Sequence, residues 1–164
     1  MAYSRPQSLA REHDRGSFAC GAPELDRWLT DHALGAQASG SARVFVSTDG
    51  SRVVGYYALA AAQLQPGEAA VLLARLAVDQ GHQGSGLGRS LLQDAMLRTD
   101  AAAEELGIRL MLVHAKHEEA GRWYRGFGFE ESPTDPLHLM LLMKDLRAYL
   151  SAAEDRSSTA RERT

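Results

Sequence analysis

The chain has 164 residues, 45% of them hydrophobic and 24% charged, and its formal net charge at pH 7 is −3. These values are ordinary for one soluble globular domain, and the slightly negative charge gives no overall attraction to nucleic acid. The single cysteine, Cys20, excludes an internal disulfide framework and a zinc site built from several cysteines.

The sequence contains no apolar run of the roughly 18 to 20 residues that a membrane helix requires. The N-terminus, MAYSRPQSLAREHD, also lacks the apolar core of a signal peptide. We therefore expect a cytoplasmic protein that does not contact a membrane.

The first third of the chain predicts a short strand, a helix and a hairpin. Pro23 suits the first turn of a helix, and the apolar residues that follow it fall on one stripe. Asp49-Gly50 supplies the positive φ values that a tight hairpin turn needs. The expected elements are a strand within residues 9–13, a helix over 21–40, and hairpin strands over 43–47 and 52–64.

A glycine-rich loop lies at the centre of the chain, between an apolar run ending in Asp79 and a helix expected over residues 86–106. Glycine can take positive φ, and it lets the backbone approach a ligand that a Cβ atom would push away. The first amides of the helix have no intrahelical partner and, with the helix dipole, favour an anion such as phosphate. The loop glycines are Gly81, Gly84, Gly86 and Gly88, and the helix residues expected to face inward are Leu87, Leu91, Leu92, Ala95 and Leu106.

The last part of the chain predicts two strands, a short helix and a tail. Gly107 suits a left-handed helix end, and the apolar run 110–113 predicts a strand buried on both faces. A helix is expected over 118–127 and a strand over 137–143, whereas the small and charged residues 151–164 predict disorder. These elements make an α/β fold, and we place its single domain at residues 1–150.

The glycine loop fits neither of two familiar phosphate motifs. A Walker loop needs Gly-Lys-Ser/Thr, and a dinucleotide fingerprint needs G-x-G-x-x-G. The run from Gln83 to Gly88, QGSGLG, instead resembles the Q/R-x-x-G-x-G/A motif of the GCN5-related N-acetyltransferases (GNAT). That family holds the pyrophosphate of acetyl-CoA in this loop.

The resemblance implies an α/β (α+β) acyl-CoA N-acyltransferase fold. Its central sheet is mixed, mostly antiparallel, split at strands four and five, and flanked by helices. The resemblance also implies two groups of cofactor-binding residues. Strand residues beside the split pair with the pantetheine arm and stabilise the developing charge on the thioester oxygen, while the loop holds the pyrophosphate. These residues are Leu76, Ala77 and Val78 on the strand, and Gln83, Gly84, Ser85, Gly86, Leu87, Gly88 and Arg89 in the loop.

Three further strings are similar to one GNAT subgroup, the acetyltransferase toxins of type II toxin–antitoxin modules. They are FACG leading into LDRWL at residues 18–29, LARLAVD at 73–79, and WYRGFGF at 123–129 followed by SP and LML. The resemblance implies acetyl transfer to the α-amino group of aminoacyl-tRNA, which blocks translation. It also implies a ribbon-helix-helix antitoxin of the DUF1778 type, contact with DNA only through that antitoxin, and a homodimer as one option. The loop at 65–70 is shorter than in these toxins, which bears on the acceptor.

Tyr124 is the candidate proton donor, because it matches the tyrosine that the family directs at the CoA sulfur. A phenol has a reference pKa of about 10, against about 8.5 for a thiol, so it is protonated at neutral pH and donates slightly uphill. The structural alternative is a core aromatic residue packed beside Trp123 and Phe127.

No carboxylate stands in a recognisable base position, although Glu118, Glu119 and His114 are candidates. An α-amino group has a pKa of about 8 and would be neutral in roughly a tenth of molecules at pH 7, whereas a lysine amine would need a base. This favours an α-amino acceptor. His114 and His117 lack a third ligand at a diagnostic spacing, so we expect no metal.

An RNA acceptor would require positive charge near the cofactor groove, and the alternative is that these charges are ordinary solvated residues. The basic residues in segments bordering the groove in this fold are Arg43, Arg75, Arg89, Lys116, Arg122 and Arg125.

Two other functions stay open: an acetyltransferase of a small amine or a protein amine, and a catalytically weak module that acts by binding its antitoxin and DNA.

Overall fold

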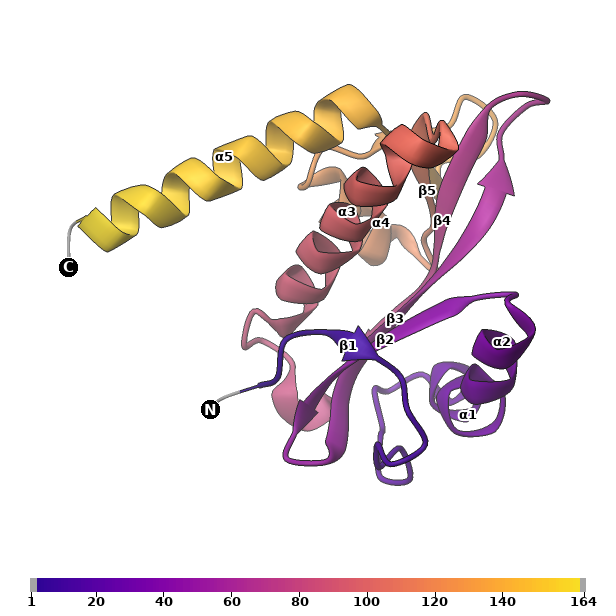
Figure 1. The fold of residues 1–164 in the computed structure, drawn as a ribbon, viewed down its shortest axis with the longest axis vertical. Coiled ribbons are helices and arrows are strands. Elements are labelled where there is room, and N and C mark those ends of the chain that lie inside the picture. Colours follow the sequence, from indigo (N-terminus) through magenta and orange to yellow (C-terminus); the bar gives the residue numbers. More distant parts are fainter. Residues whose placement is uncertain (1–2, 163–164) are drawn as a thin grey trace. The chain divides into compact units, whose positions relative to one another are not determined.

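The computed structural model describes residues 3–162, and their side chains through residue 160. The chain forms two compact units, Met1–Ala61 with Leu73–Ala95 and Ala62–Leu72 with Met96–Thr164. One seven-stranded mixed sheet has the strand order β1-β2-β3-β4-β5-β7-β6, with a parallel β4–β5 pair and flanking helices, which confirms the expected fold class (Figure 1).

The elements follow one another in the order that the sequence predicts, with three additions. The bounds are β1 Gln7–Ser8, α1 Pro23–Asp31, α2 Ala33–Ser39, β2 Arg43–Asp49, β3 Arg52–Gln63, β4 Ala69–Val78, a 3-10 turn η1 Gln80–His82, α3 Leu87–Leu106, β5 Leu110–His114, α4 Glu118–Arg125, β6 Glu130–Glu131, β7 His138–Leu142 and α5 Met143–Glu162. The three elements absent from the prediction are η1, β6 and α5.

In the first unit, β2 and β3 form the expected antiparallel hairpin. The register runs from Arg43↔Leu59 to Asp49↔Arg52, with an irregularity between Ser47 and Thr48. Gly50, at the turn, has a φ of 62°, the positive value that Asp-Gly turns supply.

The helix predicted over residues 21–40 is two helices, α1 and α2, with His32 between them. The Arg15 Nη1 donates to the carbonyl oxygens of Leu29 at 3.1 Å and Thr30 at 2.9 Å. These are carbonyls that a continuing helix would use for its own hydrogen bonds, so the arginine caps the end of α1. Gly40 then ends α2 with a φ of 80°, as expected.

The first strand is wrong in its position, because β1 is Gln7–Ser8 rather than a segment within residues 9–13. Leu9 makes the last contact to β2, its N–H donating to the Val44 carbonyl at 2.9 Å. The chain then turns, since the His13 N–H donates to Ala10 and the Ala10 N–H donates to the His13 Nδ1.

Helix α3 buries Leu87, Leu91, Leu92 and Ala95, as the sequence predicts, and Gly107 follows it with a φ of 66°. Leu106 was expected to face inward, but 68% of it is exposed, so that expectation is wrong. The apolar stripe turns away from the core in the last turn of the helix.

The second unit is built on β5, β7 and β6. Leu110↔Leu142 to His114↔His138 pair antiparallel, and Glu130↔Met140 adds the short β6. The start of β4 belongs to this unit, and the Arg109 N–H donates to the Ala69 carbonyl at 2.9 Å.

Helix α5 is the last element in the described part of the chain (Figure 1). Met143 and Leu146 are buried, and Arg147 pairs with Asp100 of α3 at 2.8 Å. In the structure α5 continues to Glu162, whereas the sequence predicts a disordered tail from residue 151. Side chains 154–160 are exposed, and the domain boundary at residue 150 stays a prediction.

None of the helices in the described part of the chain is long and apolar enough to cross a membrane.

Candidate functional site

The glycine loop of the first unit has the backbone shape of an anion cradle. Gly84 and Gly86 have φ values of 79° and 86°, and a Cβ atom at either would point into open space. Helix α3 starts at Leu87, and its first hydrogen bond runs from the Ser90 N–H to the Gly86 carbonyl at 3.1 Å. The amides of Leu87 and Gly88 precede this bond in the first turn of the helix, and they lie at the positive end of the helix dipole.

Gly55 of β3 lets this helix approach the sheet closely. A Cβ atom at Gly55 would lie 2.9 Å from Leu91 Cδ1 and 3.2 Å from Leu87 Cδ2. Leu87, a predicted cofactor-binding residue, is thus 5% exposed and anchors the start of α3. Its backbone remains available to a ligand, whereas its side chain is part of the core.

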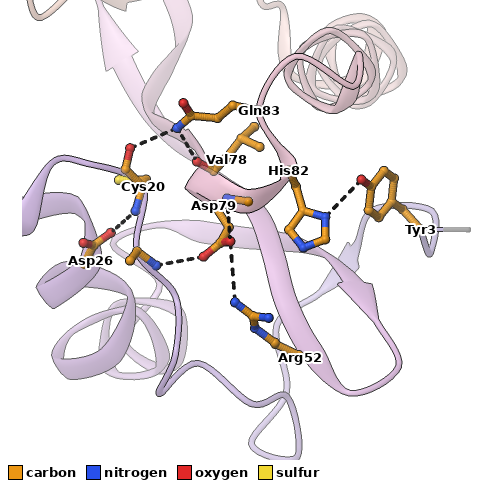
Figure 2. Close-up of polar contacts among 10 residues, drawn as sticks. Tyr3, Cys20, Asp26, Arg52, Val78, Asp79, His82 and Gln83 are labelled. Carbon is orange, nitrogen blue, oxygen red and sulfur yellow. Dashed lines mark hydrogen bonds and ion pairs between the residues drawn. The ribbon is translucent and has the colours of Figure 1, made fainter. Parts of the chain in front are cut away.

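Asp79 joins three segments at the end of β4, as Figure 2 shows. It is 5% exposed, and its carboxylate accepts from the Ala19 N–H at 3.0 Å and the Gly81 N–H at 3.2 Å. Arg52, at the start of β3, lies 3.5 Å from the same carboxylate. A buried carboxylate with these donors connects the segment leading into α1, the hairpin and the cradle.

Gln83 and Ser85, both predicted to bind the cofactor, use their side chains within the protein. The Gln83 Nε2 donates to the Cys20 carbonyl at 3.0 Å and to the Val78 carbonyl at 2.9 Å. The Ser85 hydroxyl donates to the His82 carbonyl at 2.6 Å. The side chains of Gln83 and Ser85 thus hold the loop in its shape, and the groups left to contact a ligand are those of the loop backbone.

A ring contact supports the cradle from the N-terminal segment. His82 of η1 is 8% exposed, and its Nδ1 lies 3.0 Å from the Tyr3 hydroxyl (Figure 2). The two rings meet edge to face at 5.4 Å between centroids. The sequence does not predict this contact, nor the contacts of Asp79 with Ala19 and Arg52. Each of these contacts joins residues that are far apart in the chain.

The strand residues predicted to pair with pantetheine are the last three residues of β4. Leu76 and Val78 are half-buried, whereas Ala77 is 5% exposed. One position earlier, the Arg75 guanidinium lies 4.1 Å from the centroid of Trp28, which stacks on Tyr56 of the core. Arg75 is thus held in a cation–π contact rather than being an ordinary solvated charge.

Gly88 and Arg89, the last predicted loop residues, occupy the first turn of α3. Gly88 is half-buried and Arg89 is exposed.

In the second unit, Tyr124 lies on α4 and is 7% exposed. Its ring meets Trp123 and Phe129 edge to face, at 5.0 Å and 5.6 Å between centroids. Burial raises the pKa of the Tyr124 hydroxyl above its ordinary value, so the group stays protonated at neutral pH. Both interpretations of the sequence fit this position, since the residue is a packed aromatic and a protonated phenol.

The basic face expected on α4 is partly neutralised. Arg125 pairs with Glu118 of its own helix and with Glu131 of β6. Glu118 is thereby engaged in an ion pair, which weakens its case as a base.

His114, another candidate base, is engaged with a second histidine rather than with a cation. Its ring stacks on His138 with centroids 4.1 Å apart. Burial, and then the neighbouring His138, lower the pKa of His114, while Asp135 opposes that shift. The imidazole is therefore neutral at pH 7 and able to take a proton.

The thiol of Cys20 is not activated as a nucleophile. Burial, and then the contact with Asp26, raise the pKa of Cys20 to about 11, so its thiol is protonated and unsuited to be a nucleophile. Among the side chains that the structure describes, residues 3–160, no group of three or more histidines, cysteines, aspartates or glutamates is arranged to hold a metal ion.

The fold and the glycine cradle together define an acetyltransferase of the GNAT family. This chain belongs to that family, since its residues 40–131 match the acetyltransferase (GNAT) domain. The family resemblance carried by the glycine motif is thus confirmed, and the enzyme class is that of acetyltransferases, which use acetyl-CoA.

Among named proteins, the chain is 46% identical over 161 residues to the tRNA-acetylating toxin of Mycobacterium tuberculosis, covering 90% of this chain and 97% of that one. Its fold matches a crystal structure of AtaTR bound with AcCoA, at a TM-score of 0.83 and 27% identity over 89% of this chain and 96% of the other. It also matches the AtaT–AtaR complex bound to DNA, at a TM-score of 0.80 and 26% identity over 90% and 98%.

Proposed function

We propose that this chain is the toxin of a type II toxin–antitoxin module, and that it transfers acetyl from acetyl-CoA to the α-amino group of aminoacyl-tRNA. The observation that carries the proposal is a glycine loop with positive φ at Gly84 and Gly86, placed before a helix, in a chain 46% identical to a tRNA-acetylating toxin. Acetylation of that amine would remove the nucleophile needed for peptide bond formation, and translation would stop.

The residues of the cradle fit the pyrophosphate of acetyl-CoA. Open space at Gly84 and Gly86 and the amides at the start of α3 suit a doubly charged phosphate bridge. We propose that the backbone of Gln83–Arg89 holds this bridge and that Leu76, Ala77 and Val78 pair with the pantetheine arm. When bound, acetyl-CoA supplies the activated acetyl group as a thioester.

Tyr124 then acts as the proton donor to the departing thiolate. As the N–C bond forms and the thioester C–S bond breaks, the Tyr124 phenol would give its proton to the thiolate, and the proton that the amine loses would return through solvent to the phenolate. Burial keeps the Tyr124 phenol protonated until the thiolate forms, and because the raised pKa makes the phenol a weaker acid, the proton transfer must accompany C–S cleavage rather than precede it. An α-amino acceptor is neutral often enough at pH 7 to react without a dedicated strong base.

We propose that the partner is an antitoxin of the ribbon-helix-helix (DUF1778) type, and that the chain reaches DNA only through it. The support is the similarity to AtaT, which was solved with AtaR bound to DNA. A homodimer and a cytoplasmic location belong to the same proposal, since charged tRNA is a cytoplasmic substrate.

One observation favours a second candidate, transfer to a small amine or a protein amine. The connection between β3 and β4 is a short turn, closed by Glu68 N–H donation to Gln65 at 2.9 Å and Leu64 N–H donation to Glu68 at 3.2 Å. It offers little surface with which to hold a large RNA.

Labelled acetyl-CoA separates these functions. The purified chain is incubated in parallel with total charged tRNA, with polyamines and with cell protein, and the labelled product is identified. The proposal predicts label on the aminoacyl group of tRNA. Label confined to polyamine or protein would favour the second candidate, and no label on any acceptor would favour a module that only binds antitoxin and DNA.

A further inference from the structure

The cradle is tied to the segment that leads into α1 by a run of hydrogen bonds. Ala19 uses both of its backbone groups, since its N–H donates to Asp79 at 3.0 Å and its carbonyl accepts from the Gln80 N–H at 2.8 Å. Cys20 follows, with its carbonyl accepting from Gln83 and its N–H donating to Asp26 at 2.9 Å. Residues 19–20 thus lie along residues 79–83, as Figure 2 shows.

Gln83 occupies a special place in this run because its carboxamide nitrogen has two hydrogens and two carbonyl partners. One hydrogen goes to Cys20 at 3.0 Å and the other to Val78 at 2.9 Å. Both partners can only accept, so the carboxamide must point its nitrogen toward them, and its orientation is settled by the contacts themselves. The oxygen that remains free is an acceptor, and a phosphate oxygen would be repelled by it.

We infer that the Gln83 side chain is a positioning residue that aligns the end of β4 for the pantetheine arm, and that it does not bind the pyrophosphate. This rests on the acetyl-CoA site of the proposed function. The first residue of a phosphate motif would be expected to donate to phosphate, but here both donors are committed to the protein backbone. One of them holds Val78, the strand residue whose backbone is proposed to pair with pantetheine.

The exposed position of Gln83 makes this inference testable without unfolding the protein. An exposed side chain contributes little to stability, so a variant should fold normally while its two carbonyl contacts are lost. In Gln83→Met the length is kept and both donors are removed. Gln83→Arg keeps donors that can reach both carbonyls, and it adds a positive charge.

The experiment compares two ligands by calorimetry on the full chain. One is CoA, and the other is its nucleotide half, adenosine 3′-phosphate 5′-diphosphate, which carries the phosphates without pantetheine. The readout is the ratio of the two dissociation constants. A change in the binding of the phosphates, which both ligands carry, cancels in this ratio. We expect the wild-type ratio in Gln83→Arg, and a loss of about tenfold in Gln83→Met that falls on CoA alone, since each 1.4 kcal/mol is tenfold.

Gln80→Met is the matched control, because the Gln80 contact to Ala19 is made by its backbone and survives the change. It should leave both constants within about twofold of wild type.

Equal weakening of both ligands in Gln83→Met would overturn the inference, since it would mean phosphate contact or a general distortion of the loop. Unchanged binding of both would also overturn it. Failure of the proposed function gives a different result. If the wild-type chain does not bind CoA, the proposed acetyl-CoA site is wrong. If label appears on another acceptor, only the proposed acceptor is wrong, and the ratio test still applies.

Discussion

The cradle of the first unit and the Tyr124 helix of the second unit hold their groups in different ways. The cradle depends on polar contacts between segments far apart in sequence, with Asp79 accepting from Ala19 and Gly81. Tyr124 is held by rings close to it in sequence, Trp123 and Phe129. Loss of the Asp79 carboxylate should therefore disturb the cradle. A substitution of Tyr124 that keeps an aromatic ring should leave the packing of its helix intact.

Removing only the hydroxyl of Tyr124 separates its chemical role from its packing role, and it should give the largest effect. Tyr124→Phe keeps the ring contacts, so stability should change by less than about 1 kcal/mol, whereas kcat for acetyl transfer should fall about 100-fold through loss of the general acid. Initial rates at saturating acetyl-CoA give the result. Tyr149→Phe is the control. Tyr149 meets Phe127 edge to face, as Tyr124 meets its own neighbours, and its variant should retain kcat within about twofold of wild type. An unchanged kcat in Tyr124→Phe would exclude the residue as proton donor.

Asp79→Asn tests the polar side of the comparison. An asparagine can still accept from Ala19, but its NH2 group would face the Gly81 N–H, leaving a buried donor unpaired. We expect a loss of roughly 2 to 3 kcal/mol in the free energy of unfolding, read from urea denaturation. Asp49→Asn, at an exposed hairpin position, should stay within about 0.5 kcal/mol. Equal stability of the two variants would mean that the carboxylate does not organise the cradle.

Two glycine substitutions should have opposite signs. Gly55→Ala places a Cβ atom 2.9 Å from Leu91 between β3 and α3, and we expect a loss of about 1 to 2 kcal/mol. Gly35→Ala, inside α2 with open space around it, should stabilise the chain by up to about 1 kcal/mol through helix propensity. Thermal unfolding of the pair checks the close approach of α3 to the sheet, and a neutral Gly55→Ala would contradict it.

The smallest predicted effect concerns the stacked histidines of the second unit. His114 has a folded-state pKa below its ordinary 6.5, so the unfolded chain binds the proton first as the pH falls. Its contribution to stability is present above about pH 6.5 and declines as the pH falls through the folded pKa. His138→Gln removes the neighbouring ring and should move the pKa of His114 upward in an NMR titration. A pKa that stays in place would show that His138 does not influence it.

The parts of the structure that the sequence predicts well are those that local chemistry decides. Positive φ at Gly84, Gly86 and Gly107 follows from glycine itself, and the buried stripe of α3 follows from helical spacing. The amino-acid sequence alone is therefore enough to predict the cradle and the helix that follows it.

The parts that it predicts poorly depend on distant residues. Arg15 caps the end of α1 from 14 positions earlier in the chain, and the cradle contacts join Asp79 to Ala19 across 60 positions. The side chain of Gln83 matches a phosphate motif, and only its partners show that its donors are used elsewhere. Helix α5 escaped prediction because its buried residues, Met143 and Leu146, lie only in its first turns.

The claim that the cradle receives acetyl-CoA can be tested residue by residue with an isotope-labelled chain titrated with that ligand and followed through its amide NMR signals. The account predicts that the amides of Gly84, Gly86 and Gly88 shift together with that of Val78, whereas the exposed residues 154–160 of α5 keep their positions. Acetyl-CoA that fails to bind, or that binds while the glycine signals stay in place, would contradict it.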